Sequence, residues 1–201
     1  MTSGKSSYLY PGTEVLINLA DIKNQAELTR YESIVTAQSL AELKIEPIDG
    51  DFDGEHLRQI HYHIFKNVYP FAGEFRQVDI SKDHTYFCKV KHIEYELEKL
   101  FSKLKAEKLL QGLSLEEFAR RSAYYFGELN MIHPFREGNG RVQREFIRCL
   151  GLNTGYLINW DLIISKLMVD ASIQSAFVDN VGLENVVRSC IIPHPSDSEE
   201  K

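Results

Sequence analysis

Apolar side chains recur every three or four residues over most of this chain, the period of a helix that buries one face. The first helix is predicted to follow Asn24, which can cap it, with Glu27 at the capping-box spacing. Asp53 and Ser114 are expected to cap two later helices, and the first of these ends near residue 70. Further helices are predicted over 93–104, 140–153, 160–178 and 182–191.

The period changes between residues 74 and 90. Apolar residues up to Ile80 and from Tyr86 onward lie on either side of a polar turn, Ser81 to His84. This pattern predicts a short β-hairpin, the one β element that the sequence indicates. The fold class is therefore expected to be mainly α, with one short hairpin.

The ends of the chain differ from its middle. Residues 1–12 are predicted to be an irregular arm, tethered to the body by Tyr8, Leu9 and Tyr10. Residues 13–192 are expected to form one domain, since 201 residues fit a single domain and no low-complexity linker divides them. Residues 193–201 are expected to be an acidic, disordered tail.

Composition excludes several classes of protein. With 23 basic and 29 acidic residues the net charge is −6, which disfavours direct binding of nucleic acid or of an anionic membrane. The longest apolar run, Ala123 to Phe126, is too short to span a bilayer, and the N-terminus lacks the apolar core of a signal peptide. Cys88, Cys149 and Cys190 are too few and too far apart for a disulfide framework or a CxxC motif. The expected location is therefore a reducing cytoplasm.

One segment, residues 133–144, carries groups suited to chemistry on phosphates. His133 can move a proton near neutral pH, and Glu137 can hold a hard cation such as Mg²⁺. Gly-Asn-Gly at 138–140 lets backbone N–H groups approach an anion, and Arg141 and Arg144 share one face of the helix that follows. This set suits a nucleotide polyphosphate with its metal, although it is neither a Walker A loop nor a Rossmann fingerprint.

The same segment resembles the motif of the Fic family, HxFx[D/E]GNGRxxR, at every defined position. Residues 57–61, Phe65 and residues 68–73 resemble the helix and turn that precede the family's flap, and the predicted hairpin at 78–90 stands where that flap lies. Residues 8–12 and 125–130 resemble the toxin branch of bacterial toxin–antitoxin pairs. The resemblance implies a Fic-fold helical bundle with one β-hairpin flap near the active site.

The resemblance also implies an activity, the transfer of AMP from ATP to a hydroxyl side chain of a target protein with release of pyrophosphate. It makes His133 the general base, Glu137 the residue that holds Mg²⁺, and Phe135 the structural anchor of the loop. The implied nucleotide-binding residues are Gly138, Asn139, Gly140, Arg141 and Arg144. Among these, Asn139 would lie near the α-phosphate, with Arg141 at the β-phosphate and Arg144 at the γ-phosphate.

The flap would align the hydroxyl-bearing segment of the target by strand-like pairing. The residues expected to dock the target in this way are Val78, Asp79, Ile80, Tyr86 and Phe87. Toxin-branch relatives suggest a type II topoisomerase subunit as the target, but the flap side chains leave its identity open. The resemblance implies a bacterial cytoplasm as the location, and translocation of the chain into a host cell also stays open.

Many Fic proteins are inhibited by a motif [S/T]xxxE[G/N], whose glutamate pairs with the arginine at the Arg144 position. Only Ser196 has a glutamate four residues later, and Lys201 follows this Glu200 in place of glycine or asparagine. The match lies in the predicted acidic tail, which is more simply a solubilising segment. Inhibition is therefore expected in trans, from a small helical antitoxin that supplies the glutamate.

Two other functions stay open beside AMP transfer. The motif recognises phosphates rather than a base, so another nucleotide or phosphate-containing group is an alternative donor. A nucleotide-binding module without catalysis is a second alternative, disfavoured because His133 and Glu137 are both present. A zinc site at His56, His61 and His63 is disfavoured by the spacing of these residues, and Trp160 is expected to pack in the core.

Overall fold

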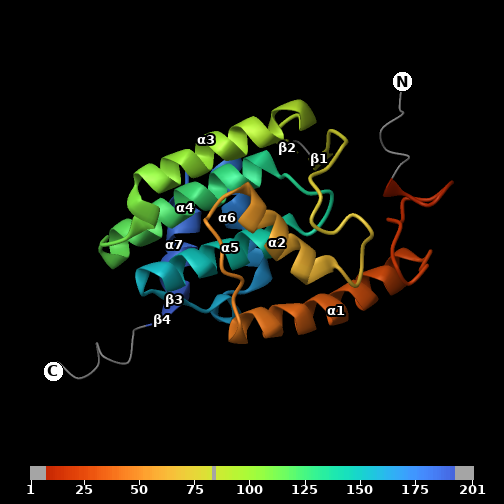
Figure 1. Ribbon diagram of the computed structural model, residues 1–201, viewed down its shortest axis with the longest axis horizontal. Helices are drawn as coiled ribbons and strands as arrows, with labels where there is room; N and C mark the ends of the chain where they lie inside the picture. Colours follow the sequence, from red (N-terminus) through yellow and green to blue (C-terminus); the bar gives the residue numbers. More distant parts are fainter. Residues whose placement is uncertain (1–7, 83–84, 193–201) are drawn as a thin grey trace.

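The computed structural model describes residues 8–82 and 85–192, which form seven α-helices and two small antiparallel sheets (Figure 1). The helices are α1 Gln25–Ile45, α2 Gly54–Phe65, α3 Ile93–Ala106, α4 Leu115–Ile132, α5 Asn139–Thr154, α6 Ser165–Phe177 and α7 Val181–Cys190. The strands are β1 Ser81–Lys82, β2 Thr85–Tyr86, β3 Leu157–Ile158 and β4 Ile191–Ile192. Short 3₁₀ turns occupy Val90–His92, Lys108–Leu110 and Trp160–Leu162. The predicted mainly α fold is confirmed.

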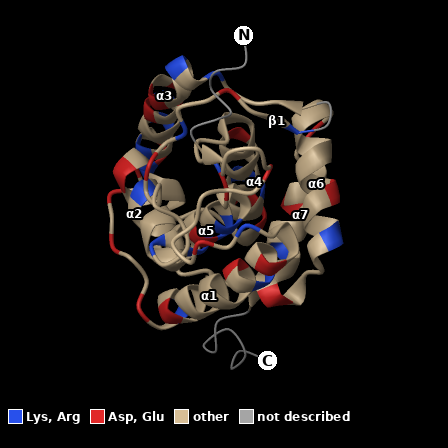
Figure 2. Cartoon of the chain, turned by 90° about the vertical axis from the view of Figure 1, so that its right-hand side faces the viewer, with Lys and Arg blue, Asp and Glu red and all other residues tan. Residues whose placement is uncertain are grey.

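The helices α4 and α5 lie at the centre of the molecule. In Figure 1, α3 runs along the upper side and α1 along the lower side, with α2, α4 and α5 between them. Figure 2, which turns the molecule by 90°, shows basic residues at α5 in the middle of this face, between α2 on one side and α6 on the other. The start of α5 is thus enclosed by helices from distant parts of the chain.

Three predicted helix caps are present. Asn24 accepts hydrogen bonds from the N–H groups of the first turn of α1, and Asp53 accepts one from the first turn of α2. Ser114 and Glu117 form the predicted capping box of α4. The helix α2 ends at Phe65, earlier than predicted, because the buried residues that follow belong to a separate turn rather than to the same helical stripe.

The β structure differs from the prediction in two ways. The hairpin has only two residues in each strand, with Ser81 opposite Tyr86, so the apolar positions Val78, Ile80 and Phe87 lie outside the strands. A second pairing, between β3 and β4, was not predicted from the sequence. Strands of two residues are too short to show a period of two, and the pairing of β3 with β4 joins segments more than 30 residues apart.

The N-terminal arm packs on the body where it is described. Tyr8 is buried, and its ring meets that of Phe71 edge-on at 5.1 Å. The predicted acidic tail at 193–201, with Ser196 and Glu200, lies outside the described residues, as do residues 1–7 and the hairpin turn at 83–84. The domain limits stay predictions. Across the described residues, no helix is long and apolar enough to cross a membrane.

Candidate active site

The loop between α4 and α5 begins at His133, which ends α4 in a left-handed conformation with φ 48°. This conformation is uncommon for a residue with a side chain, and such residues gather at functional sites. The backbone N–H of His133 still donates to the carbonyl of Leu129, at 2.9 Å, so the residue stays bound to its helix. The imidazole is therefore presented from a fixed backbone.

The amide of Asn139 closes this loop. Its Oδ1 accepts from the N–H of Phe135 at 2.9 Å, and its Nδ2 donates to the carbonyl of Phe135 at 2.8 Å. Both side chains are almost fully buried. The asparagine side chain thus serves the shape of the loop, a role that the sequence analysis missed, while Phe135 lies in the core, as expected for an anchor.

Gly138 is required by two independent features of the loop. Its φ is +79°, a conformation that side chains disfavour, and a Cβ there would lie 2.1 Å from Cζ of Phe65. The helix α5 begins directly after it, so the first N–H groups of that helix have no partner within the helix. A helix start of this kind favours an anion.

His133 is held in the tautomer that a general base needs. Its Nδ1 lies 3.1 Å from the carbonyl oxygen of Asn130, so Nδ1 carries the hydrogen and Nε2 is left to accept a proton. Burial is the main cause that lowers the pKa of His133 to about 4, and the nearby cations Arg76 and Lys82 lower it further. The ring of Phe87 stacks on the imidazole at 3.9 Å. The imidazole is therefore neutral at physiological pH.

A cavity of about 550 Å³ opens beside this loop. Its wall includes His133 and every residue from Arg136 to Arg144 except Val142. Other parts of the wall come from α4, from α6 and from three residues around the hairpin, Lys82, Thr85 and Phe87. The structure thus brings the predicted catalytic, metal-binding and nucleotide-binding residues to one cavity. Among the predicted docking residues of the flap, only Phe87 reaches it, whereas Val78 is buried and Tyr86 is exposed.

Glu137 offers a carboxylate suited to a divalent cation. Its side chain is 43% exposed, and Oε1 accepts from the N–H of Gly138 at 2.8 Å. No group of three metal-ligating side chains occurs in the described part of the chain. Mg²⁺ commonly uses one carboxylate together with water and substrate phosphates, so a single accessible carboxylate beside an anion site fits this ion.

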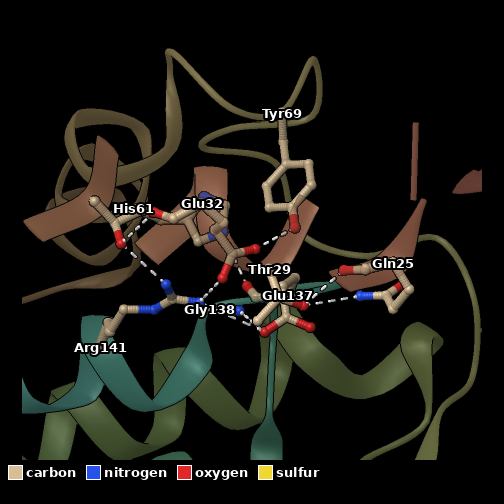
Figure 3. A network of polar contacts seen from close by, with 9 residues as sticks. Gln25, Thr29, Glu32, His61, Tyr69, Glu137, Gly138 and Arg141 are labelled. Atoms are coloured by element: carbon tan, nitrogen blue, oxygen red, sulfur yellow. Dashed lines mark hydrogen bonds and ion pairs between the residues drawn. The ribbon is translucent and has the colours of Figure 1, made fainter. Parts of the chain in front are cut away.

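The two arginines of the motif differ in their partners. Arg141 Nη2 lies 2.6 Å from Oε1 of Glu32, and Arg141 Nη1 donates to Thr36 at 3.1 Å, so the guanidinium is tied to α1 (Figure 3). Arg144 forms no ion pair or side-chain hydrogen bond with any described residue. Burial, and secondarily the charge of Arg141, lowers the pKa of Arg144. An anion entering the cavity would therefore supply the partner that Arg144 lacks.

Arg76, which the sequence analysis missed, connects the segment before the hairpin to the catalytic loop. Its side chain is fully buried and donates to the carbonyls of His133 and Val78, each at 2.8 Å, of Ile132 at 3.3 Å, and of Cys88. The sequence offered no clear signal, because the stretch around Arg76 also holds the polar residues Glu74, Gln77 and Asp79. Its partners are backbone carbonyls, which sequence does not mark.

His61 performs a similar task on the other side of the loop. Its Nδ1 accepts from the N–H of Gly73 at 2.7 Å, its Nε2 faces the carbonyl of Glu137 at 3.1 Å, and its ring stacks on Phe135 at 4.0 Å. Burial is the main cause that lowers the pKa of His61 to about 4, which keeps the ring neutral. His61 therefore supports the loop as a hydrogen-bonded core residue.

Sequence comparisons agree with this geometry. Residues 51–150 match the Fic/DOC family. The chain is 42% identical to protein adenylyltransferase VbhT of Bartonella schoenbuchensis over 90% of its own length, and spans 38% of that longer protein. It is 33% identical to the Escherichia coli protein named "Probable protein adenylyltransferase Fic", over 98% of this chain and 96% of that protein.

This chain belongs to the Fic/DOC family. The structural comparison supports the same assignment. The N-terminal Fic domain of a Bartonella quintana effector, solved with bound ADP, is similar with a TM-score of 0.91 and 31% identity, over 96% of this chain and 98% of that one. BepC of Bartonella tribocorum, solved with bound AMPPNP, has a TM-score of 0.91 and 26% identity, over 96% of this chain and 99% of that one. The Fic fold is therefore shared over nearly the whole chain.

Proposed function

We propose that this chain is a protein adenylyltransferase, which transfers AMP from ATP to a hydroxyl side chain of a target protein. The observation that carries the proposal is the neutral His133, whose Nε2 is free to accept a proton at the wall of the cavity shared with Arg144 and the start of α5. Relatives named protein adenylyltransferase and Fic domains solved with adenine nucleotides support the choice of ATP.

In the proposed reaction, the hydroxyl oxygen of the target attacks the α-phosphorus of ATP. His133 Nε2 takes the hydroxyl proton as the new O–P bond forms. The bond between the α-phosphorus and the oxygen that bridges to the β-phosphate breaks, which releases pyrophosphate. The loop at Gly138 to Gly140, through the backbone N–H groups at the start of α5, and the guanidinium of Arg144 bind and orient the phosphates. Glu137 would hold Mg²⁺, which neutralises phosphate charge when bound.

This proposal is tested with bacterial lysate and ATP carrying the label on the α-phosphate. The wild type should label a protein band and His133→Ala should not, and mass spectrometry of the band should find AMP on a serine, threonine or tyrosine. Label transferred from the γ-phosphate instead would establish phosphate transfer. Tight nucleotide binding without any transfer would establish a binding module.

We further propose that a small helical antitoxin holds the enzyme inactive by supplying a glutamate to Arg144. Two features support this: the guanidinium lacks a partner among the described residues, and α6 beside the cavity carries exposed apolar side chains. The exposed apolar residues on α6 and the adjoining segments are Leu162, Ile164, Leu167, Val169, Ile173, Phe177, Val178 and Val181. Expression of the chain alone in bacteria should arrest growth in a His133-dependent way, and harmless expression of the active enzyme would contradict this proposal.

The target is proposed to be a type II topoisomerase subunit in a bacterial cytoplasm, as the likeness to the toxin branch suggests. A direct test is incubation of purified topoisomerase subunits with the enzyme and α-labelled ATP. Modification of a hydroxyl side chain on one subunit is expected. A lysate in which the labelled band is an unrelated protein would overturn this choice of target.

A further inference from the structure

A polar network ties α1 to the start of α5 (Figure 3). Glu32 lies at its centre, between the phenol of Tyr69 and the guanidinium of Arg141. Thr36, one turn further along α1, accepts from Arg141 Nη1 at 3.1 Å, and the guanidinium lies over the ring of Phe65 at 4.6 Å. One motif arginine is thus held on three sides by residues outside the motif.

Arg141 lies between two carboxylates. Its Nη2 is 2.6 Å from Oε1 of Glu32 but 3.7 Å from Oε1 of Glu137. Glu137 stands four residues before Arg141, in the loop that leads into α5. Only the first of these distances is a hydrogen bond. The arginine therefore hydrogen-bonds to the carboxylate of α1 and forms only a longer ion pair with Glu137.

Several features favour this choice of partner. The Glu32 side chain is 15% exposed, against 43% for Glu137, so solvent screens the pair with Glu32 less. Tyr69 donates its hydroxyl to the second oxygen of Glu32. Burial and the nearby Glu32 raise the pKa of Tyr69, which keeps that donor protonated. Glu32 is thus fixed in place before it meets Arg141.

We infer that Glu32 is a positioning residue, which holds Arg141 and so leaves the Glu137 carboxylate available to a divalent cation. Without the charge of Glu32, the guanidinium would turn to Glu137, 3.7 Å away, and compete with the cation. The inference rests on the proposed function, because it concerns the Mg²⁺ that accompanies ATP. Glu32 does not line the cavity, and it acts on the nucleotide site only through Arg141.

The test measures binding of a fluorescent ATP analogue at increasing Mg²⁺ concentration, without any target protein. Glu32→Gln keeps the shape of the side chain but removes its charge. We expect the Mg²⁺ concentration that gives half of the change in nucleotide binding to rise about fivefold, which corresponds to the upper range of free energies for one partly exposed ion pair. Nucleotide binding without Mg²⁺ should not be weakened. Glu27→Gln, which removes an exposed carboxylate from the same helix, should leave the titration unchanged.

Two further variants test the route through Arg141. In an Arg141→Met background, Glu32→Gln should shift the Mg²⁺ titration no further, since the competing cation is gone. Thr36→Val, which loosens the same guanidinium while keeping both carboxylates, should raise the half-effect concentration by less than Glu32→Gln does. If thermal denaturation shows that Glu32→Gln does not fold, the Mg²⁺ titration of Thr36→Val serves as the test in its place.

The outcomes separate this inference from the proposed function. A wild type whose nucleotide binding ignores Mg²⁺ would contradict the proposed metal role and the inference together. A wild type that responds to Mg²⁺, with Glu32→Gln responding at the same concentration, would overturn the inference alone. An equal shift in the Arg141→Met background would also overturn it, because Glu32 would then act by another route.

Discussion

Two halves of the site meet at the start of α5 and differ in how their polar groups are satisfied. In the anchored half, formed by Arg141, Asn139 and Arg76, side-chain donors have protein partners. In the open half, formed by His133 and Arg144, His133 Nε2 and the Arg144 guanidinium have none among the described residues. Groups left unpaired in a folded protein carry a free-energy penalty unless a ligand pairs with them.

The difference indicates a division of labour between the halves. The anchored half fixes the loop, and its loss should lower the free energy of unfolding. The open half is held by the anchored half and meets the substrate, so its loss should change activity or binding with little effect on stability.

The largest effect is expected from His133→Ala in the open half. AMP transfer should fall by about 10²–10⁴-fold, the usual contribution of a general base. The free energy of unfolding should fall by much less than for Arg76→Met, since only one hydrogen bond and one stacking contact of the imidazole are lost. Transfer is measured with α-labelled ATP and stability by urea denaturation. If His133→Ala lowered the free energy of unfolding as much as Arg76→Met does, His133 would belong to the anchored half.

The largest loss of stability is expected from Arg76→Met in the anchored half. The substitution leaves the carbonyls of His133, Val78, Cys88 and Ile132 without this donor, which should lower the free energy of unfolding by roughly 3 kcal/mol. Arg58→Met is the matched control, because Arg58 also donates to a carbonyl, that of Gly73, but is half exposed. Urea denaturation should show a clearly smaller loss for Arg58→Met, and equal losses would remove the distinction.

The pH dependence of the open half follows from the burial of His133. A base must be neutral, and the pKa of His133 is lowered to about 4, so transfer should stay constant from pH 8 to 6 and fall only as the pH drops through about 4. The imidazole signals in an NMR titration check this directly. Phe87→Ala removes the stacked ring and should move the midpoint upward, toward 6.5. A wild-type midpoint near 6.5 would show that the imidazole is not buried in solution.

Much of the fold was predictable because its signals are local. Caps at Asn24, Asp53 and Ser114 lie beside the helices that they start, and the motif from His133 to Arg144 is contiguous. The gathering of the motif residues at one cavity also followed from helix geometry, since a helix presents Arg141 and Arg144 on one face.

The supporting residues were not predictable because their partners are distant in sequence or belong to the backbone. Glu32 meets Arg141 across 109 positions, and Arg76 binds carbonyls, which every residue carries. His61 looked like a candidate metal ligand that spacing then disfavoured, whereas its partners are an N–H and a carbonyl. Such roles depend on the packing of α1 and α2 against α5, which sequence periodicity does not specify.

The most direct test of the account compares ATP and AMP binding by the wild type, Arg144→Ala and His133→Ala. We expect Arg144→Ala to weaken ATP binding by about tenfold, through the loss of one charge-assisted contact, and to leave AMP binding nearly unchanged. His133→Ala should bind both nucleotides as the wild type does. Equal loss of ATP binding in Arg144→Ala and His133→Ala, or equal loss of ATP and AMP binding in Arg144→Ala, would contradict the assignment of Arg144 as the unpaired cation that receives the polyphosphate.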